Sequence, residues 1–202
     1  LNQINKQTMQ LNKTRPAGTK NGIEYFYDDY GTCFCQPLDQ SNKVGGGHEE
    51  GRNQLENPQR LERIKAMLPT GEAVLDFGCG NGLLVKYLKD NGINAHGYDK
   101  FTDKNTLPDV ESVHLVTLIE VIEHLQEPFS EIDDIFNCLV PGGKVMIETS
   151  FTDWLNFEAD YINPDAGHNT VFSHAGLTAL MLSKGFKEGS HFNRNVRIFV
   201  KP

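Results

Sequence analysis

Apolar runs alternate with helical patterns along most of the chain, and this alternation predicts an α/β fold. Four runs have the length of buried strands, and they span Ala73–Asp76, Ala95–Tyr98, Val113–Ile119 and Lys144–Glu148. Apolar residues recur at helical spacing in four further segments, namely Pro58–Leu68, Leu83–Leu88, Phe129–Leu139 and the stretch after Ser173 that carries Leu177, Leu180 and Met181. Such alternation is typical of a Rossmann-like, doubly wound and mostly parallel sheet with helices on both faces.

Residues that start helices and link strands set the expected boundaries. Asn57 is expected to cap a helix that begins at Pro58, and Ser173 is expected to cap the last helix. Phe186–Val200 predicts two strands joined near Asn193–Asn195, so the sheet should end in an antiparallel strand.

The N-terminal part of the chain has weaker patterns. Residues 1–21 lack an apolar period and are rich in Asn, Gln, Lys and Thr, so they are expected to form a flexible arm. Ile23–Pro37 predicts a hairpin with its turn near Asp28, and its two thiols, Cys33 and Cys35, are too few for a four-ligand zinc site. Edge strands over one end of the core are the favoured interpretation. One domain is expected over 22–202, with a cap and helix (22–69), a strand-and-loop half (72–150) and a C-terminal loop, helix and strands (151–202).

Three glycines at alternate positions follow the first buried strand. Gly78, Gly80 and Gly82 let the backbone turn sharply and approach a ligand closely. Their spacing differs from the dinucleotide fingerprint G-x-G-x-x-G, whose third glycine is replaced here by Leu83. Asp76 places a carboxylate just before the loop, where it would repel a pyrophosphate but could bind an amino group. The spacing therefore favours a ligand other than a dinucleotide, at the switch point expected after Asp76.

The segment Val74–Gly82 resembles the first motif of class I S-adenosylmethionine-dependent methyltransferases. Gly97–Asp99 is similar to the family's second-strand motif, whose acidic residue holds the ribose hydroxyls; a carboxylate can accept from two adjacent hydroxyls. Thr117–Leu125 resembles the fourth-strand motif of the small-molecule branch, and Leu139–Lys144 resembles the turn into the fifth strand. The resemblance covers Glu72–Ser150, and four motifs in the right order are more specific than one.

The resemblance implies an enzyme with S-adenosylmethionine as its cofactor and with 72–150 as the cofactor-binding half, and it makes 151–202 the substrate side. The implied cofactor-binding residues are Asp76, Gly78, Cys79, Gly80, Asn81, Gly82, Asp99, Lys100, Ile119 and Glu120. Arg52 is a further candidate, because its guanidinium could hold the methionine carboxylate in a bidentate fork; a solvated loop is the alternative.

The chain departs from the family pattern after Asp99. About a dozen residues separate Asp99 from the strand at Val113, too few for the helix and extra strand of the family, so the third-strand region is expected to be shortened. The adenine contact usually comes from that region. Asp109 and Glu111 are alternative candidates for it.

Methyl transfer is an in-line displacement in which the cofactor supplies the electrophile, so the chain must mainly position a nucleophile and exclude water. No metal site is expected. His168 is the candidate general base, because Tyr161–His168 lies between the fifth strand and the last helix, and its Gly-His pattern resembles sugar and natural-product methyltransferases. A structural hydrogen bond is the alternative for His168, and a structural role is favoured for His124.

Composition narrows the class of acceptor. The formal charge of −8, from 19 basic and 27 acidic residues, disfavours a nucleic-acid partner. No apolar run approaches the roughly 20 residues of a membrane span, and the few cysteines fit a reducing cytoplasm. The expected acceptor is a small polar molecule, such as a sugar or metabolite that offers a hydroxyl or a carbon. The alternatives are a non-catalytic cofactor-binding partner or regulatory module and a methyltransferase that acts on a macromolecule.

Overall fold

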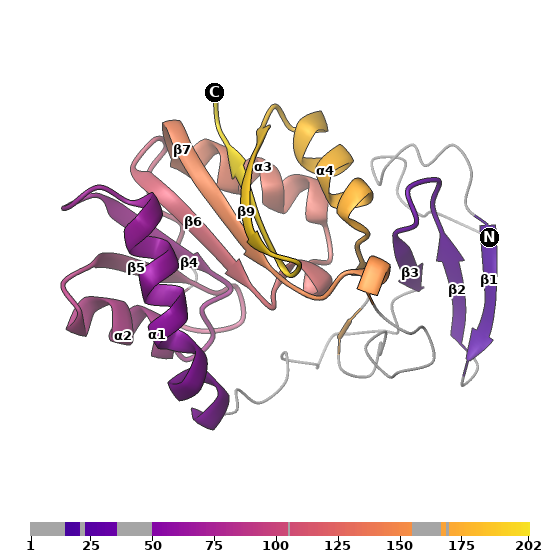
Figure 1. Ribbon diagram of the computed structural model, residues 1–202, viewed down its shortest axis with the longest axis horizontal. Helices are drawn as coiled ribbons and strands as arrows, with labels where there is room; N and C mark the ends of the chain where they lie inside the picture. The colour runs from indigo at the N-terminus through magenta and orange to yellow at the C-terminus, as the bar shows by residue number, and fades with distance from the viewer. Residues whose placement is uncertain (1–14, 21–22, 36–49, 105, 155–166, 169) are drawn as a thin grey trace.

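The computed structural model describes residues 15–20, 23–35, 50–104, 106–154, 167–168 and 170–202 of the chain (Figure 1). The strands are β1 (Arg15–Lys20), β2 (Ile23–Tyr27), β3 (Cys33–Cys35), β4 (Ala73–Phe77), β5 (Asn94–Tyr98), β6 (Val113–Ile119), β7 (Leu139–Glu148), β8 (Thr170–Val171), β9 (Lys187–Asn193) and β10 (Val196–Val200). The helices are α1 (Glu50–Met67), α2 (Leu83–Asp90), α3 (Pro128–Cys138) and α4 (His174–Ser183), with short 3-10 turns η1 (Ile122–His124) and η2 (Thr152–Trp154). None of the described helices is both long and apolar enough to cross a bilayer.

The main sheet has six strands in the order β5-β4-β6-β7-β10-β9. The pairs β4–β5, β4–β6 and β6–β7 are parallel, and β10 runs antiparallel to both β7 and β9. This arrangement confirms the predicted mostly parallel sheet with an antiparallel C-terminal strand. The chain leaves β4 for β5 on one side and returns to β6 on the other, so the predicted switch point follows β4.

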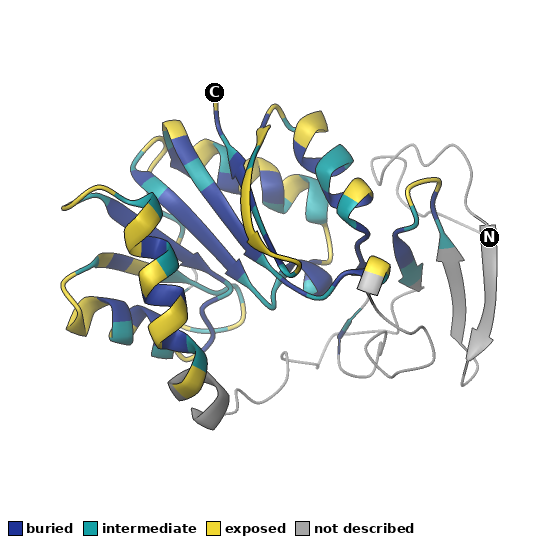
Figure 2. Ribbon diagram, viewed as in Figure 1, coloured by how far each residue is buried: buried dark blue, intermediate teal, exposed yellow. Residues whose placement is uncertain are grey.

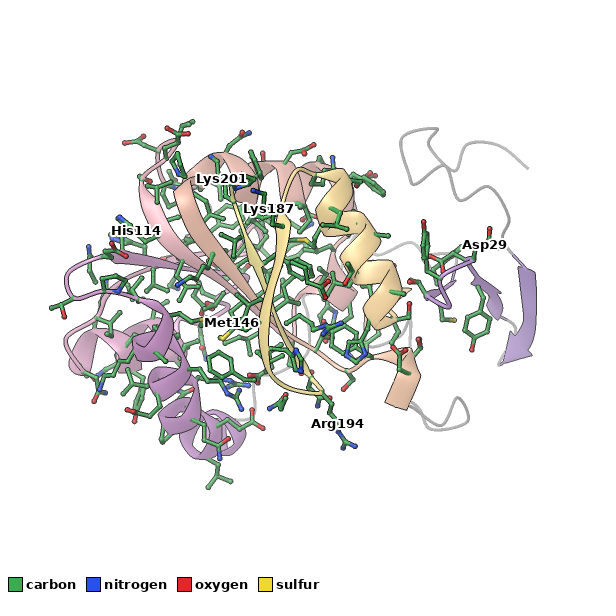
Figure 3. The ribbon with its side chains drawn as sticks, turned by 45° about the horizontal axis from the view of Figure 1, so that its top comes forward. Asp29, His114, Met146, Lys187, Arg194 and Lys201 are labelled. Carbon is green, nitrogen blue, oxygen red and sulfur yellow. The ribbon has the colours of Figure 1, made fainter. Side chains whose placement is uncertain are left out.

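Two apolar layers cover the two faces of this sheet (Figure 2). Leu61 and Ile64 of α1 pack with residues of α2 on one face, and Ile132 of α3 packs with Leu177 of α4 on the other. Neighbouring strand residues point to opposite faces, since successive side chains of a strand alternate. Figure 3 shows side chains filling the space between sheet and helices, with Met146 among them. Strands buried on both faces explain the continuous apolar runs in the sequence.

A second, smaller sheet lies beside the main one in the order β1-β2-β3-β8 (Figure 1). Its strands β2 and β3 form the predicted hairpin, and the turn is closed by bonds between Asp28 and Thr32. The expected flexible arm is wrong in one part, because β1 spans Arg15–Lys20 and pairs with β2. Residues 1–14 lie outside the described residues. Pairing with distant β8 was not predicted, since a two-residue strand carries no period.

Two predicted boundaries are wrong. Helix α1 begins at Glu50 rather than at a cap on Asn57, so Pro58 lies inside it. A proline inside a helix costs about 3 kcal/mol or more, and burial of neighbouring side chains such as Leu61 offsets this cost. The turn expected within Leu139–Lys144 is instead part of β7, where the register against β6 shifts.

The segment between β5 and β6 is short, as predicted. Its described residues, 99–104 and 106–112, form no helix or strand. The structure thus confirms that the third-strand region is shortened. Ser173 caps α4 as expected, because its Oγ accepts from the amide of Gly176 at 2.9 Å.

Candidate functional site

The loop after β4 is bonded to the end of β5. The amides of Gly78 and Cys79 both donate to the carbonyl oxygen of Tyr98, at 2.7 and 3.0 Å. The Gly80 amide donates to Asp99 Oδ2 at 2.9 Å. These bonds bring the glycine loop (Gly78–Gly82) and the carboxylate of the second parallel strand to one place at the switch point.

All three glycines of this loop have left-handed backbone, with φ of +77° at Gly78, +53° at Gly80 and +83° at Gly82. A side chain is strained there at each position. A Cβ on Gly78 would also lie 2.6 Å from Val121 Cγ2, so this glycine is required by packing inside the protein. The glycine pattern therefore has a local structural cause as well as its predicted role toward a ligand.

Asp76 is the second-last residue of β4, just before the loop. Its carboxyl is buried, and 5% of the residue's surface is exposed. Its Oδ1 accepts a hydrogen bond from Thr117 Oγ1 at 2.8 Å. Burial raises the pKa of Asp76 to about 6, although the Thr117 bond and the charge of Arg60 oppose this shift; the charge of Asp99 adds to it. Asp76 can therefore exchange a proton close to neutral pH. Thr117 and Arg60 were not predicted as site residues.

Both oxygens of Asp99 bind the backbone. Oδ2 accepts from Gly80, and Oδ1 accepts from the amide of Phe101 at 2.9 Å. A carboxylate offers roughly four lone-pair sites, so two acceptor sites remain. Lys104, which no motif indicated, places its Nζ 3.5 Å from the Gly80 carbonyl oxygen. The loop, Asp99 and Lys104 thus form one connected group.

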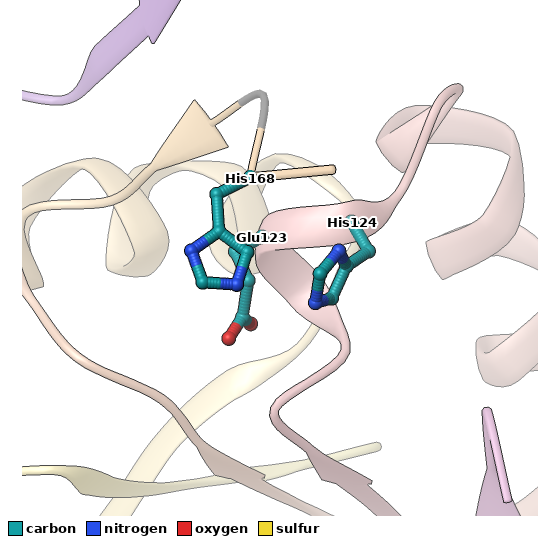
Figure 4. Close-up of side chains that lie close together, drawn as sticks. All are labelled: Glu123, His124 and His168. Carbon is teal, nitrogen blue, oxygen red and sulfur yellow. The ribbon is translucent and has the colours of Figure 1, made fainter. Parts of the chain in front are cut away.

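A second group lies past the ends of β6 and β7. Glu123 and His124 belong to η1, and His168 comes from the segment before β8 (Figure 4). The rings of His124 and His168 meet edge to face, with centroids 4.6 Å apart. Glu123 Oε2 accepts from Thr149 Oγ1 at 3.0 Å, and both residues are buried. His168, the predicted base, therefore lies beside His124 and Glu123, whose part in this group was not predicted.

The profile of a family described as a methyltransferase domain matches residues 49–188. The chain belongs to this family. This match confirms the resemblance that the motifs indicated. The sheet order described above agrees with the predicted fold class.

Individual relatives agree with this family. The ubiquinone biosynthesis O-methyltransferase of Coxiella burnetii is 28% identical over 167 residues, which cover 69% of this chain and 65% of that protein. The chain spans about half to two thirds of the length of the curated relatives that it matches.

Two solved structures share the fold at low sequence identity. The 1,6-didemethyltoxoflavin-N1-methyltransferase of Burkholderia thailandensis has a TM-score of 0.59 at 15% identity, over 88% of this chain and 98% of that one. An amino pentose methyltransferase from Micromonospora echinaspora has a TM-score of 0.54 at 14% identity, over 79% of this chain and 100% of that one. These structures support the Rossmann-like arrangement of the methyltransferase domain.

Several other predicted site residues of the methyltransferase domain have local partners. The Asn81 Oδ1 accepts from the amide of Leu83 at 3.3 Å, at the start of α2. Cys79 is buried, and burial raises the pKa of its thiol to about 12, so the thiol stays neutral. Ile119 ends β6, and Glu120 follows it with a φ of +54°. The Glu120 amide donates to the Glu148 carbonyl oxygen at 2.8 Å.

Lys100 and Arg52 are the remaining predicted cofactor-binding residues. Lys100 Nζ donates to Glu131 Oε1 of α3 at 2.8 Å, so its charge is already paired. Arg52 lies in α1 rather than in a loop, and its side chain is outside the described residues. Their roles toward the cofactor stay predictions.

The two candidates for the adenine contact lie away from the glycine loop. Glu111 Oε1 lies 3.4 Å from Lys201 Nζ, and Lys201 follows β10 at the edge where β6 and β7 begin (Figure 3). Asp109 lies in the same segment, and its carbonyl oxygen accepts from Ser112 Oγ at 2.6 Å. Both residues precede β6 and therefore lie at the opposite edge of the sheet from the glycine loop. The sequence could not place these two residues, because a segment without helix or strand does not show which way the chain runs.

Proposed function

We propose that this chain binds S-adenosylmethionine beyond the carboxyl ends of β4 and β5 and transfers its methyl group to a small polar acceptor. The observation that carries the proposal is the 2.9 Å bond between the Gly80 amide and Asp99 Oδ2. It joins the two motifs that the family uses for an adenosyl group, at the switch point where such sheets bind ligands.

The residues at this edge fit the cofactor in chemistry. Asp99 keeps two acceptor sites for the adjacent ribose hydroxyls. Asp76, buried next to Thr117, is assigned to the amino group of the methionine moiety, where a positive charge would favour its ionised form. S-adenosylmethionine supplies a methyl group on a positively charged sulfur, and the role of the chain is to hold it in line with the acceptor.

An oxygen acceptor has the best support. The curated relatives are named as O-methyltransferases, and the two solved structures are named for small-molecule acceptors. His168 stays the candidate base for the acceptor hydroxyl, because it lies beyond the strand ends beside His124. The buried free thiols of Cys79 and Cys138 support a reducing compartment such as the cytoplasm.

Calorimetry tests the cofactor proposal. The chain is titrated with S-adenosylhomocysteine and with S-adenosylmethionine, and both are expected to bind in one-to-one ratio. No measurable heat with either ligand, for a chain that is folded by circular dichroism, would remove the proposal. Mass spectrometry then follows methyl incorporation into candidate sugars and phenolic or other hydroxylated metabolites, and a product heavier by one methylene identifies the acceptor.

A further inference from the structure

Two imidazoles and one carboxylate lie close together on the acceptor side of the domain (Figure 4). One ligand atom of each of Glu123, His124 and His168 lies within 4.8 Å of those of the other two. We propose that these three side chains bind a divalent transition-metal ion of the zinc type. Sequence patterns predicted no metal here, because the ligands come from two distant segments.

The ligand types select the class of ion. Two His nitrogens and one carboxylate oxygen form a ligand set that suits Zn²⁺ and neighbouring transition metals and leaves coordination positions open. Mg²⁺ and Ca²⁺ prefer sites made of oxygen atoms. Glu123, His124 and His168 supply only one carboxylate among them, so a transition metal is favoured over Mg²⁺.

The spacing of the ligand atoms requires only small adjustments. Two ligand atoms on one tetrahedral zinc ion stand roughly 3.3–3.5 Å apart, given Zn–N bonds of about 2.0–2.1 Å. The three atoms already lie within 4.8 Å of one another, and both histidines are half-buried. Side-chain rotation of His124 and His168 can therefore close the remaining distance.

The surroundings hold the ligands in place. Thr149 Oγ1 donates to Glu123 Oε2 at 3.0 Å, and 2% of Thr149 and 1% of Glu123 are exposed. Such a bond orients a ligating carboxylate. Gly167 has a φ of +85°, and a Cβ there would lie 3.0 Å from His124 Nδ1. The backbone before His168 thus packs so closely against His124 that a side chain at position 167 would crowd the His124 ring.

The place of the ion gives it a part in recognising the acceptor. It would lie past the ends of β6 and β7, and its open positions suit acceptor oxygen atoms, which narrows the acceptor to oxygen-rich molecules. This second step rests on the proposed function. Metal binding by His168 would replace its role as general base, whereas binding of the ion itself does not depend on methyl transfer.

Metal binding is tested on the full chain without a histidine tag. Zn²⁺ is titrated by calorimetry, and Co²⁺ is followed by its visible absorption, which reports coordination geometry. One Zn²⁺ is expected to bind with a Kd on the order of 1 μM or tighter. Glu123→Gln, His124→Ala and His168→Ala are each expected to weaken binding by about tenfold or more, and His96→Ala, which changes an exposed histidine of β5, is the matched control. Mg²⁺ is expected to bind far more weakly than Zn²⁺.

Two outcomes would overturn the metal site. One is a Kd for Zn²⁺ weaker than about 100 μM in the parent chain; the other is equal Zn²⁺ affinity of His168→Ala and His96→Ala. Titration of the same samples with S-adenosylhomocysteine separates this result from the proposed function. Cofactor binding without zinc binding removes only the metal site, and zinc binding without cofactor binding removes only the methyltransferase proposal.

Discussion

The two ends of the candidate site differ in how far apart along the chain their contacts lie. At the cofactor end, the Gly80 amide and the Asp99 carboxylate are 19 residues apart. At the proposed acceptor end, formed by Glu123, His124 and His168, Glu123 bonds to Thr149, 26 residues away, and His168 comes from a third segment before β8. A contact between a loop and the next parallel strand follows from one βαβ unit, whereas contacts among three segments depend on the whole sheet. The cofactor end is therefore easier to predict from the sequence. Substitutions there are expected to act mainly on binding of the cofactor.

The largest expected effect is on the cofactor end. Asp99→Ala should weaken binding of S-adenosylhomocysteine by roughly 100-fold or more, because two hydrogen bonds to a charged group contribute about 1.5–3 kcal/mol each. It also removes the acceptor of the Gly80 amide. Isothermal calorimetry measures the change, and Asp103→Ala, whose side chain is 91% exposed, is the control. Affinity within twofold of the parent would mean that the ribose site lies elsewhere.

A second prediction concerns Asp76, because its proposed role toward the cofactor conflicts with the stability of the free protein. Its pKa is raised from 3.8 to about 6, so the protonated carboxyl is the form that the fold favours. The stability that this preference contributes is complete below pH 4 and is lost as the pH rises through 6. A shift of about two units corresponds to about 3 kcal/mol. Ionised Asp76 is thus expected to destabilise the free protein at pH 8.

Asp76→Asn should remove this pH dependence. The variant should be more stable than the parent by about 2–3 kcal/mol at pH 8, with the difference closing toward pH 4. It should also bind S-adenosylhomocysteine roughly tenfold more weakly, since one charged partner is lost. Urea unfolding at several pH values measures the first effect, with Asp109→Asn as an exposed control. A constant difference across pH would contradict the raised pKa.

The sequence predicted those parts of the molecule that short segments determine. Strands β4 to β6, helix α2 and the Ser173 cap depend on apolar period and on residues within a few positions. Errors arose where distant contacts decide the outcome: Pro58 stays inside α1, and Glu111 pairs with Lys201. For the same reason, motifs indicated the glycine loop and Asp99 but gave no sign that Glu123 and His168 meet.

Thr149 offers a smaller test of the acceptor end. Thr149→Val keeps the shape of the side chain but removes the hydroxyl that donates to Glu123 Oε2. Because the carboxylate is buried, the free energy of unfolding should fall by about 2 kcal/mol. Chemical denaturation measures this change, with the exposed Thr106→Val as control. Affinity for S-adenosylhomocysteine should stay within twofold of the parent, and a larger loss would show that the two ends are coupled.

The smallest expected effect concerns how the small sheet is attached beside the acceptor end. Ser173 Oγ accepts from the Gly176 amide at 2.9 Å and donates to the Tyr30 carbonyl oxygen, 143 residues away along the chain, at 2.5 Å. Ser173→Ala removes both bonds, and loss of an N-cap serine costs about 1 kcal/mol. The exposed Ser190→Ala is the control. Thermal unfolding should show a lower midpoint for Ser173→Ala alone, while cofactor affinity stays unchanged, because neither bond reaches the glycine loop. If Ser173→Ala instead weakened cofactor binding, contacts at the acceptor end would contribute to the geometry of the cofactor end. Local motifs would then be insufficient to specify the cofactor end.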